Sequence, residues 1–375
     1  MFRSADFDAH EEVVFATDAM TGLHAILAIH NTSRGPALGG CRAWTYETDD
    51  AAVSDVLRLS RGMTYKNALA DLPLGGGKSV CLLPTSGERP HDLSAKAMFE
   101  SLGAAIDRLG GRYITAEDVG TKPADMLAIR RHTKHAAGIP PEHGGYGDPS
   151  PFTARGCFNA VKAAARAALN KSDLKGVHVA LQGLGNVGYR LAEHLAQAGA
   201  RLTVCDINGD AIERAERELG AAVVGTDEIH RVDADIFSPN ALGASLNADT
   251  IPELRVGAIA GGANNQLATN ANGEQLAARG ILYAPDYAVN AGGVILICGE
   301  YYGWERADID RRVDAIEARL VTIFERAKAD GAPTSEIADA MAEAKFQVRR
   351  ARELCKLDQF GARCLALDQR GENAR

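Results

Sequence analysis

One short segment, in which an apolar run turns directly into a glycine-rich stretch, constrains the fold of this chain more than any other feature. Residues 177–182 read Val-His-Val-Ala-Leu-Gln, which is typical of a strand, and residues 183–188 read Gly-Leu-Gly-Asn-Val-Gly before a helical stretch. Glycine at the first, third and sixth places allows a tight turn, a close approach of a pyrophosphate and close helix–strand packing. Free N–H groups at the helix start favour the phosphates. We therefore predict a dinucleotide-binding βαβ unit; a glycine-rich turn that binds no nucleotide is the disfavoured alternative.

The residue that follows the next strand indicates which dinucleotide is bound. Asp206 comes directly after the apolar stretch 201–205 and lies 18 residues beyond Gly188. A carboxylate about 20 residues after the glycines bonds the ribose hydroxyls and repels a 2′-phosphate. Ile207 and Asn208 supply no compensating cation. The pattern predicts NAD rather than NADP, with a cofactor-binding set of Gly183, Leu184, Gly185, Asn186, Val187, Gly188 and Asp206.

The arrangement of predicted elements indicates two α/β domains, as expected for 375 residues. A segment rich in glycine and proline, 138–151, marks a boundary. After it come a helix, 153–169, and strands that alternate with helical stretches, which is typical of a parallel sheet. These strands are expected at 177–182, 201–205, 222–224, 236–237, 256–260 and 281–283. Before it we expect strands 13–15, 25–29 and 113–115 and helices 51–70 and 93–109.

The domain limits follow from this boundary. We predict a first domain over residues 1–145 and a Rossmann-type dinucleotide domain over 146–329. A long helix, 308–329, carries an apolar stripe of Val313, Ile316, Leu320 and Ile323. A last helix, about 335–355, is predicted to pack back on the first domain, which would add residues 330–375 to it.

Composition argues against several function classes. A net charge of −8 disfavours binding to nucleic acid or an anionic membrane. No apolar run approaches the ~18 residues of a membrane span, and the polar start of the chain does not resemble a signal peptide. The cysteines are odd in number and form no CxxC pair, which predicts buried thiols in a cytoplasmic protein without a structural metal. They are Cys41, Cys81, Cys157, Cys205, Cys298, Cys355 and Cys364.

Two lysines and one aspartate stand out in the first half. Lys78 follows three glycines but is not part of a phosphate-binding loop, because Leu72 occupies the place of a required glycine. Lys66 lies twelve residues earlier among uncharged neighbours. If the two ammonium groups were close together, one could act as a base while the other held an anion; otherwise both are solvated surface charges. Asp118 follows a predicted strand and is equally a catalytic candidate or a turn residue.

Several longer motifs together resemble the amino-acid dehydrogenase superfamily of glutamate, leucine, phenylalanine and valine enzymes, and most closely its leucine dehydrogenases. The resemblance runs from about Glu11 to about Glu353. Its motifs are Gly-Pro-Ala-Leu-Gly-Gly at 35–40, Met-Thr-Tyr-Lys-Asn-Ala at 63–68, Leu-Gly-Gly-Gly-Lys at 74–78, Thr-Ala-Glu-Asp-Val-Gly at 115–120, Ala-Pro-Asp-Tyr at 284–287 and Asn-Ala-Gly-Gly-Val at 290–294.

This resemblance implies reversible, NAD-dependent oxidative deamination of an L-amino acid in a cleft between a substrate and oligomerisation domain and the Rossmann domain. It implies that Lys66 holds the substrate carboxylate, that Lys78 activates the attacking water and that Asp118 moves protons to and from the amino group. The remaining implied contacts are Gly39, Gly40, Met63 and Asn264 for the substrate, and Thr153, Ala263 and Asn290 for the cofactor. Relatives also imply a homo-oligomer, whether dimer, hexamer or octamer.

The substrate side chain is expected to meet Leu38, Ala116, Val294 and Ile297, which are all apolar. Glutamate dehydrogenases carry a lysine in place of Leu38, and burying an unpaired substrate carboxylate costs several kcal/mol, so glutamate is disfavoured. Leucine, isoleucine or valine is predicted. Ile297 replaces a common valine, and one methylene shifts discrimination by only ~1–3 kcal/mol. The alternatives are a phenylalanine- or tryptophan-type enzyme and a regulatory relative that binds NAD without catalysis.

Overall fold

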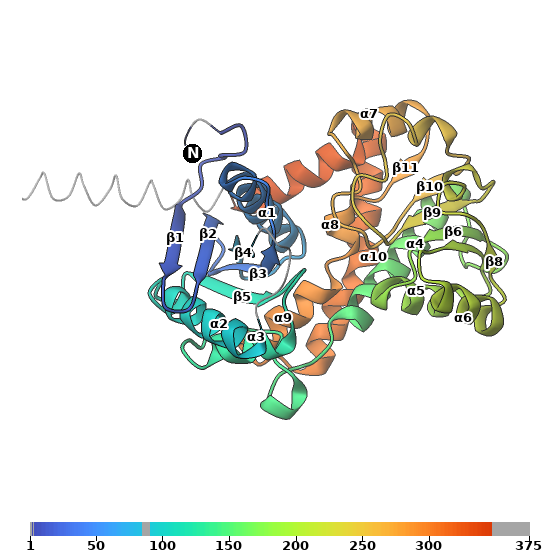
Figure 1. Cartoon of the computed structure of the whole chain (residues 1–375). Helices are drawn as coiled ribbons and strands as arrows, with labels where there is room; N and C mark the ends of the chain where they lie inside the picture. The colour runs from blue at the N-terminus through green and yellow to red at the C-terminus, as the bar shows by residue number, and fades with distance from the viewer. Residues whose placement is uncertain (1, 3, 85–90, 347–375) are drawn as a thin grey trace, which may run out of the picture.

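The computed structural model describes residue 2, residues 4–84 and residues 91–346. Two α/β units lie side by side, each built round its own sheet, with α9 and α10 running between them (Figure 1). This confirms the predicted fold class. The division at residue 145 stays a prediction.

The first sheet has the strand order β1-β2-β4-β3-β5. Strand β2 pairs antiparallel with β1 and β4, whereas β3 pairs parallel with β4 and β5. The strands are β1 (Glu12–Asp18), β2 (Leu23–Asn31), β3 (Ala37–Trp44), β4 (Gly75–Leu82) and β5 (Tyr113–Glu117). Alternate residues of β2 reach opposite faces: Ile26 and Ala28 pack with α1, and Leu27 and Ile29 pack with α2 and α3. The helices are α1 (Asp49–Leu69), α2 (Asp92–Asp107) and α3 (Pro123–Arg130).

Strands β3 and β4 were not predicted, because their glycines are typical of a loop. The structure shows that the glycines allow close packing of backbones inside the sheet. A Cβ on Gly39 would lie 1.6 Å from the Gly77 carbonyl oxygen, and one on Gly75 would lie 1.8 Å from the Asn31 carbonyl oxygen. Larger residues cannot fit there, so the glycine-rich segment is a buried strand that ends near the site.

The second sheet is parallel throughout, with the order β11-β10-β9-β6-β7-β8, as predicted for a Rossmann-type unit. Its strands are β6 (His178–Gln182), β7 (Arg201–Cys205), β8 (Ala222–Val223), β9 (Ile236–Pro239), β10 (Ala258–Ile259) and β11 (Leu282–Tyr283). Its helices are α4 (Ser150–Leu169), α5 (Asn186–Gln197), α6 (Gly209–Leu219) and α7 (Ala271–Ala278). Strands β8, β10 and β11 are shorter than predicted.

The remaining helices lead back to the first unit. They are α8 (Asp286–Val289), α9 (Gly292–Tyr302) and α10 (Arg306–Asp330), and residues 334–346 are also helical. The predicted stripe of α10 is fully buried. The final helical segment contacts α1: the Tyr65 ring lies 5.4 Å from that of Phe346, and Tyr65 Oη donates to Glu343. Residues 347–355 of the predicted last helix lie outside the described residues.

Two further observations concern the described residues only. The five cysteines among them are buried and free, as predicted; Cys355 and Cys364 lie outside the described residues. In the same part of the chain, every helix is too short or too polar to cross a membrane.

Candidate active site

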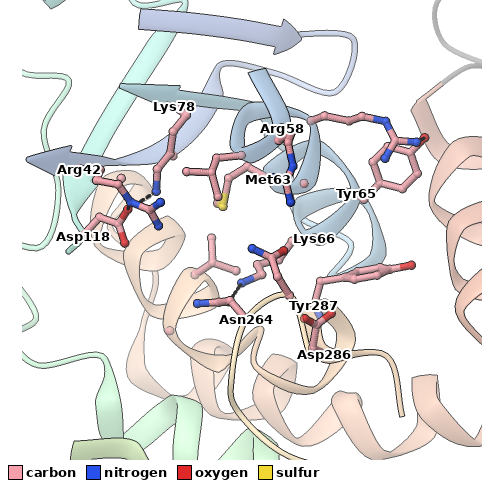
Figure 2. Close-up of a pocket in the computed structure, with 18 of the residues that line it drawn as sticks. Arg42, Arg58, Met63, Tyr65, Lys66, Lys78, Asp118, Asn264, Asp286 and Tyr287 are labelled. Atoms are coloured by element: carbon pink, nitrogen blue, oxygen red, sulfur yellow. Dashed lines mark hydrogen bonds and ion pairs between the residues drawn. The ribbon is translucent and has the colours of Figure 1, made fainter. Parts of the chain in front are cut away.

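A cavity of about 1140 Å³ is lined by residues of both units (Figure 2). It brings together every residue that we predicted for catalysis or substrate binding. These residues are Leu38, Gly39, Gly40, Met63, Lys66, Lys78, Ala116, Asp118, Asn264, Val294 and Ile297. Two of the predicted cofactor residues, Thr153 and Asn186, line the same cavity. Within residues 2, 4–84 and 91–346, no group of three His, Cys, Asp or Glu side chains is arranged to hold a metal ion.

Lys78 and Asp118 form an ion pair at one wall of the cavity (Figure 2). Lys78 lies on β4 and is only 5% exposed, and Asp118 directly follows β5. The Arg42 guanidinium Nε lies 3.5 Å from Asp118 Oδ2. Burial raises the pKa of the Asp118 carboxyl, but the ion pair with Lys78 and the charge of Arg42 outweigh it and hold that pKa below its usual range. The carboxylate is therefore kept charged.

Lys66 approaches the cavity from α1 on the opposite side. Its Nζ donates a 3.2 Å hydrogen bond to Asn264 Oδ1, which also accepts from Asn290 Nδ2 at 2.8 Å. Burial lowers the pKa of the Lys66 ammonium, the carboxylate of Asp286 opposes that shift, and the charge of Lys78 adds to it. Two lysines that the sequence could not place together thus line one cavity, close enough for their charges to interact.

The part of the cavity beside these charges is apolar. Leu38 from β3 is 2% exposed and Ile297 from α9 is 8% exposed, and Ala116 and Val294 join them in the lining. Gly138 lines the cavity on the side that faces Ile297, since a Cβ on this glycine would lie 3.5 Å from Ile297 Cδ1. An uncharged side chain of moderate size would be desolvated here without leaving a buried charge unpaired.

The turn between β6 and α5 fits a dinucleotide. Gly183 has φ = +94°, and a Cβ on Gly188 would lie 2.0 Å from the Gly183 carbonyl oxygen, so the helix packs directly on the turn. A Cβ on Gly185 would meet nothing within 4 Å, which leaves the backbone open to a pyrophosphate at the start of α5. The Asp206 carboxylate accepts from the N–H groups of Leu184 and Asn208. These contacts place it beside the glycine turn, to which Leu184 and Val187 also belong.

The other two predicted cofactor residues lie on loops that lead toward Asn264. Ala263 donates its N–H to the Pro239 carbonyl at the end of β9, and Asn290 Nδ2 also donates to the Gly262 carbonyl. They connect the end of the parallel sheet to the lysine cavity.

Sequence reasoning missed Arg42. Its Nη1 lies 2.8 Å from Asp55 Oδ2, which also accepts from Tyr46 Oη at 2.6 Å, so the arginine joins Asp118 to α1. The sequence feature that could have identified Arg42 is its position on β3, two residues after the predicted substrate contact Gly40. Parallel pairing of β3 with β5 brings Arg42 beside Asp118, but neither β3 nor this pairing was predicted.

Comparisons with known proteins agree with this geometry. Residues 8–135 match a family model described as the Glu/Leu/Phe/Val dehydrogenase dimerisation domain, and residues 144–221 and 208–354 match Glutamate/Leucine/Phenylalanine/Valine dehydrogenase. A leucine dehydrogenase of Bacillus cereus is 48% identical over 90% of this chain and 91% of its own length. A phenylalanine dehydrogenase of Bacillus thermotolerans is 43% identical over 92% and 90%.

A solved structure extends this similarity to the arrangement of the two units. The crystal structure of L-tryptophan dehydrogenase from Nostoc punctiforme matches with a TM-score of 0.78 and 39% identity, over 91% of this chain and 97% of its own. The resemblance inferred from the motifs is confirmed. The chain belongs to the Glu/Leu/Phe/Val dehydrogenase family, and it is an NAD-dependent amino-acid dehydrogenase.

Proposed function

We propose that this protein catalyses the reversible oxidative deamination of branched-chain L-amino acids: leucine, isoleucine or valine. The observation that carries the proposal is one cavity in which two lysines and Asp118 lie beside the apolar group of Leu38, Ala116, Val294 and Ile297. The higher identity to leucine than to phenylalanine dehydrogenases supports the same substrate class.

Lys66 binds the substrate α-carboxylate in this mechanism, helped by the backbone at Gly39 and Gly40. All three line the cavity, and the glycines allow a ligand to approach the main chain. The hydrogen bond from Lys66 to Asn264 orients the ammonium toward the second unit. Met63 lies in the same lining, one turn before Lys66 on α1.

Lys78 and Asp118 carry out the proton transfers. NAD, when bound, would supply the hydride acceptor for this oxidation. Lys78, in its neutral amine form, takes a proton from the attacking water, and Asp118 moves protons to and from the departing amino group. Gly183, Gly185 and the α5 N-terminus are the groups that would hold the pyrophosphate, and Thr153, Asn186, Ala263 and Asn290 lie toward the lysine cavity. The balanced reaction converts an L-amino acid, water and NAD into a 2-oxo acid, ammonium, NADH and a proton.

The proposal is tested by NADH formation from L-leucine, L-isoleucine, L-valine, L-phenylalanine, L-tryptophan and L-glutamate. We expect the highest kcat/KM with an aliphatic branched substrate, because Leu38 cannot pair a distal carboxylate and an aromatic ring needs more room. An aromatic preference would contradict the assigned pocket while leaving the lysine chemistry intact. Binding of NAD without activity on any substrate would favour the regulatory alternative.

Replacing Asp206 by alanine is expected to relax the choice of NAD over NADP. The carboxylate accepts from the turn at Leu184 N, and its removal would take away both the ribose acceptor and the charge that repels a 2′-phosphate. Charge-assisted hydrogen bonds contribute about 1.5–3 kcal/mol. The kcat/KM for NAD divided by the kcat/KM for NADP should therefore fall by about 10- to 100-fold. Kinetics with both cofactors measure it; an unchanged ratio would show that Asp206 does not select the cofactor.

The pH dependence of substrate capture should report the shifted pKa of Lys66. Burial lowers this pKa, and the carboxylate binds the protonated amine, so kcat/KM for L-leucine should fall as pH rises through it. We expect the alkaline inflection below the ordinary lysine value of 10.5. Kinetics across alkaline pH at saturating NAD measure it, and an inflection at or above 10.5 would contradict the assignment.

We also propose a homo-oligomer in the cytoplasm. The description of the matched first domain as a dimerisation domain supports self-association. The free, buried cysteines support a reducing compartment. The proposed partners are the amino-acid substrate and further copies of this chain.

A further inference from the structure

We propose that Glu300 is a positioning residue that sets the width of the apolar end of the cavity. It would do so by clamping a connecting loop, defined here as residues 138–147, against α9. This inference rests on the proposed function, because the pocket concerned is the one that takes the amino-acid side chain.

The Glu300 carboxylate closes the base of the connecting loop. Its Oε1 accepts hydrogen bonds from the N–H groups of Gly138 at 2.8 Å and Ile139 at 3.0 Å, and its Oε2 accepts from Tyr146 at 2.9 Å. The loop folds back on itself between these points, since a Cβ on Gly145 would lie 1.7 Å from the Ile139 carbonyl oxygen. One side chain therefore holds both ends of the loop.

The clamped loop is also a wall of the cavity. Gly138, Pro140, Pro141 and Gly147 are among the lining residues. Gly138 has φ = +78° and no side chain, so only its backbone faces Ile297, across the space in which a Cβ would lie 3.5 Å from Ile297 Cδ1. The Gly138 N–H group donates its hydrogen bond to Glu300. The position of this backbone therefore depends on the Glu300 carboxylate.

Helix α9 contains both Ile297, which lines the apolar end of the cavity, and Glu300, which binds the connecting loop. Ile297 and Glu300 are three residues apart, which places them on neighbouring positions of one helix face. A shift of the connecting loop relative to α9 would change the gap between Gly138 and Ile297 directly. By fixing the position of the connecting loop, Glu300 would therefore set the size of the substrate side chain that fits into the apolar end of the cavity.

Other contacts should keep the loop attached when Glu300 is changed. Tyr146 Oη donates to the Trp304 carbonyl at 3.0 Å, and His135 Nδ1 lies 2.7 Å from Tyr301 Oη. A glutamine at position 300 keeps the size of the side chain and one acceptor oxygen. Its NH₂ group, however, would face the Tyr146 N–H as a second donor, so one end of the loop would be released.

The test compares Glu300→Gln with the wild type in oxidation of L-valine, L-leucine and L-phenylalanine by NAD. We expect the ratio of kcat/KM for L-phenylalanine over L-leucine to rise at least about fivefold, mainly through a higher KM for L-leucine. A merely structural role would lower the active fraction and leave this ratio unchanged. Glu325→Gln, on an exposed position of α10, makes the same chemical change as a control and should leave all three values unaltered.

A second variant covers the case in which Glu300→Gln does not fold. Tyr146→Phe removes the bond to the Trp304 carbonyl without touching the carboxylate, and a smaller rise of the same ratio is expected. Unchanged or lowered ratios in the folded variants, with a wild type that oxidises L-leucine, would overturn this inference alone. A wild type that oxidises none of the three amino acids would overturn the proposed function instead.

Discussion

Replacing Lys78 by alanine is expected to lower kcat for L-leucine by about 10²–10⁴-fold, the range that general acid–base groups contribute. The ammonium is buried in the cavity wall and paired with Asp118, and among the described residues that line the cavity the other lysine is Lys66, from α1. Lys66 is engaged by Asn264 and is assigned to the carboxylate, so it should not substitute. Affinity for NAD should be unchanged, because the glycine turn lies on the other unit.

Steady-state kinetics and a fluorescence titration with NAD measure the two halves of this expectation. Lys175→Ala, at an exposed position before β6, removes a lysine far from the cavity and should leave both values unchanged. A Lys78→Ala variant with near wild-type kcat would show that another group activates the water. A loss of NAD binding would show that the variant disturbs the fold.

Replacing Asp118 by asparagine is expected to reduce kcat to a similar extent and also to lower stability. Asparagine keeps the shape but cannot accept a proton at neutral pH, and it leaves Lys78 and Arg42 without their shared anion. Because the carboxylate is 22% exposed toward the cavity, we expect about 1–3 kcal/mol of destabilisation rather than the larger cost of a fully buried pair. Turnover and urea denaturation measure the two effects.

The stability effect has a defined pH dependence. The folded-state pKa of Asp118 is lowered from the ordinary 3.8, so the carboxylate stabilises the fold above that value, and this contribution is lost as the pH falls through the folded pKa. The stability difference between wild type and Asp118→Asn should therefore shrink on acidification below about pH 4. A difference that stays constant there would contradict the ion-pair account, and full turnover of the variant would remove Asp118 from the proton transfers.

Local patterns predicted the second unit well. Strand β6, the glycine turn and Asp206 follow one another within 30 residues, and parallel pairing of β6 with β7 brings Asp206 beside the turn. The apolar stripe of α10 was readable because helical spacing alone decides which residues face the core. Each of these features depends on neighbours in sequence.

The first unit was harder, because its chemistry depends on backbones that meet across a sheet. The glycines of β3 and β4 are there for close packing, which no sequence spacing reveals. Lys66 and Lys78 were singled out by their neighbours, but only the fold places them in one cavity. Arg42 contacts Asp118, which lies 76 positions further along the chain, and Glu300 contacts loop residues that lie 154–162 positions before it. No pattern in the neighbouring sequence therefore identifies either residue.

The central claim is that this cavity deaminates a branched-chain amino acid with reduction of NAD. The most direct test is the stoichiometry of the reaction with L-leucine, by measuring NADH, ammonium and the 2-oxo acid in one sample. We expect the three products to form in equal amounts, and the Lys78→Ala variant to form at most about 1% of these amounts over the same time. NADH without an equal amount of ammonium, or no NADH from L-leucine at all, would contradict it.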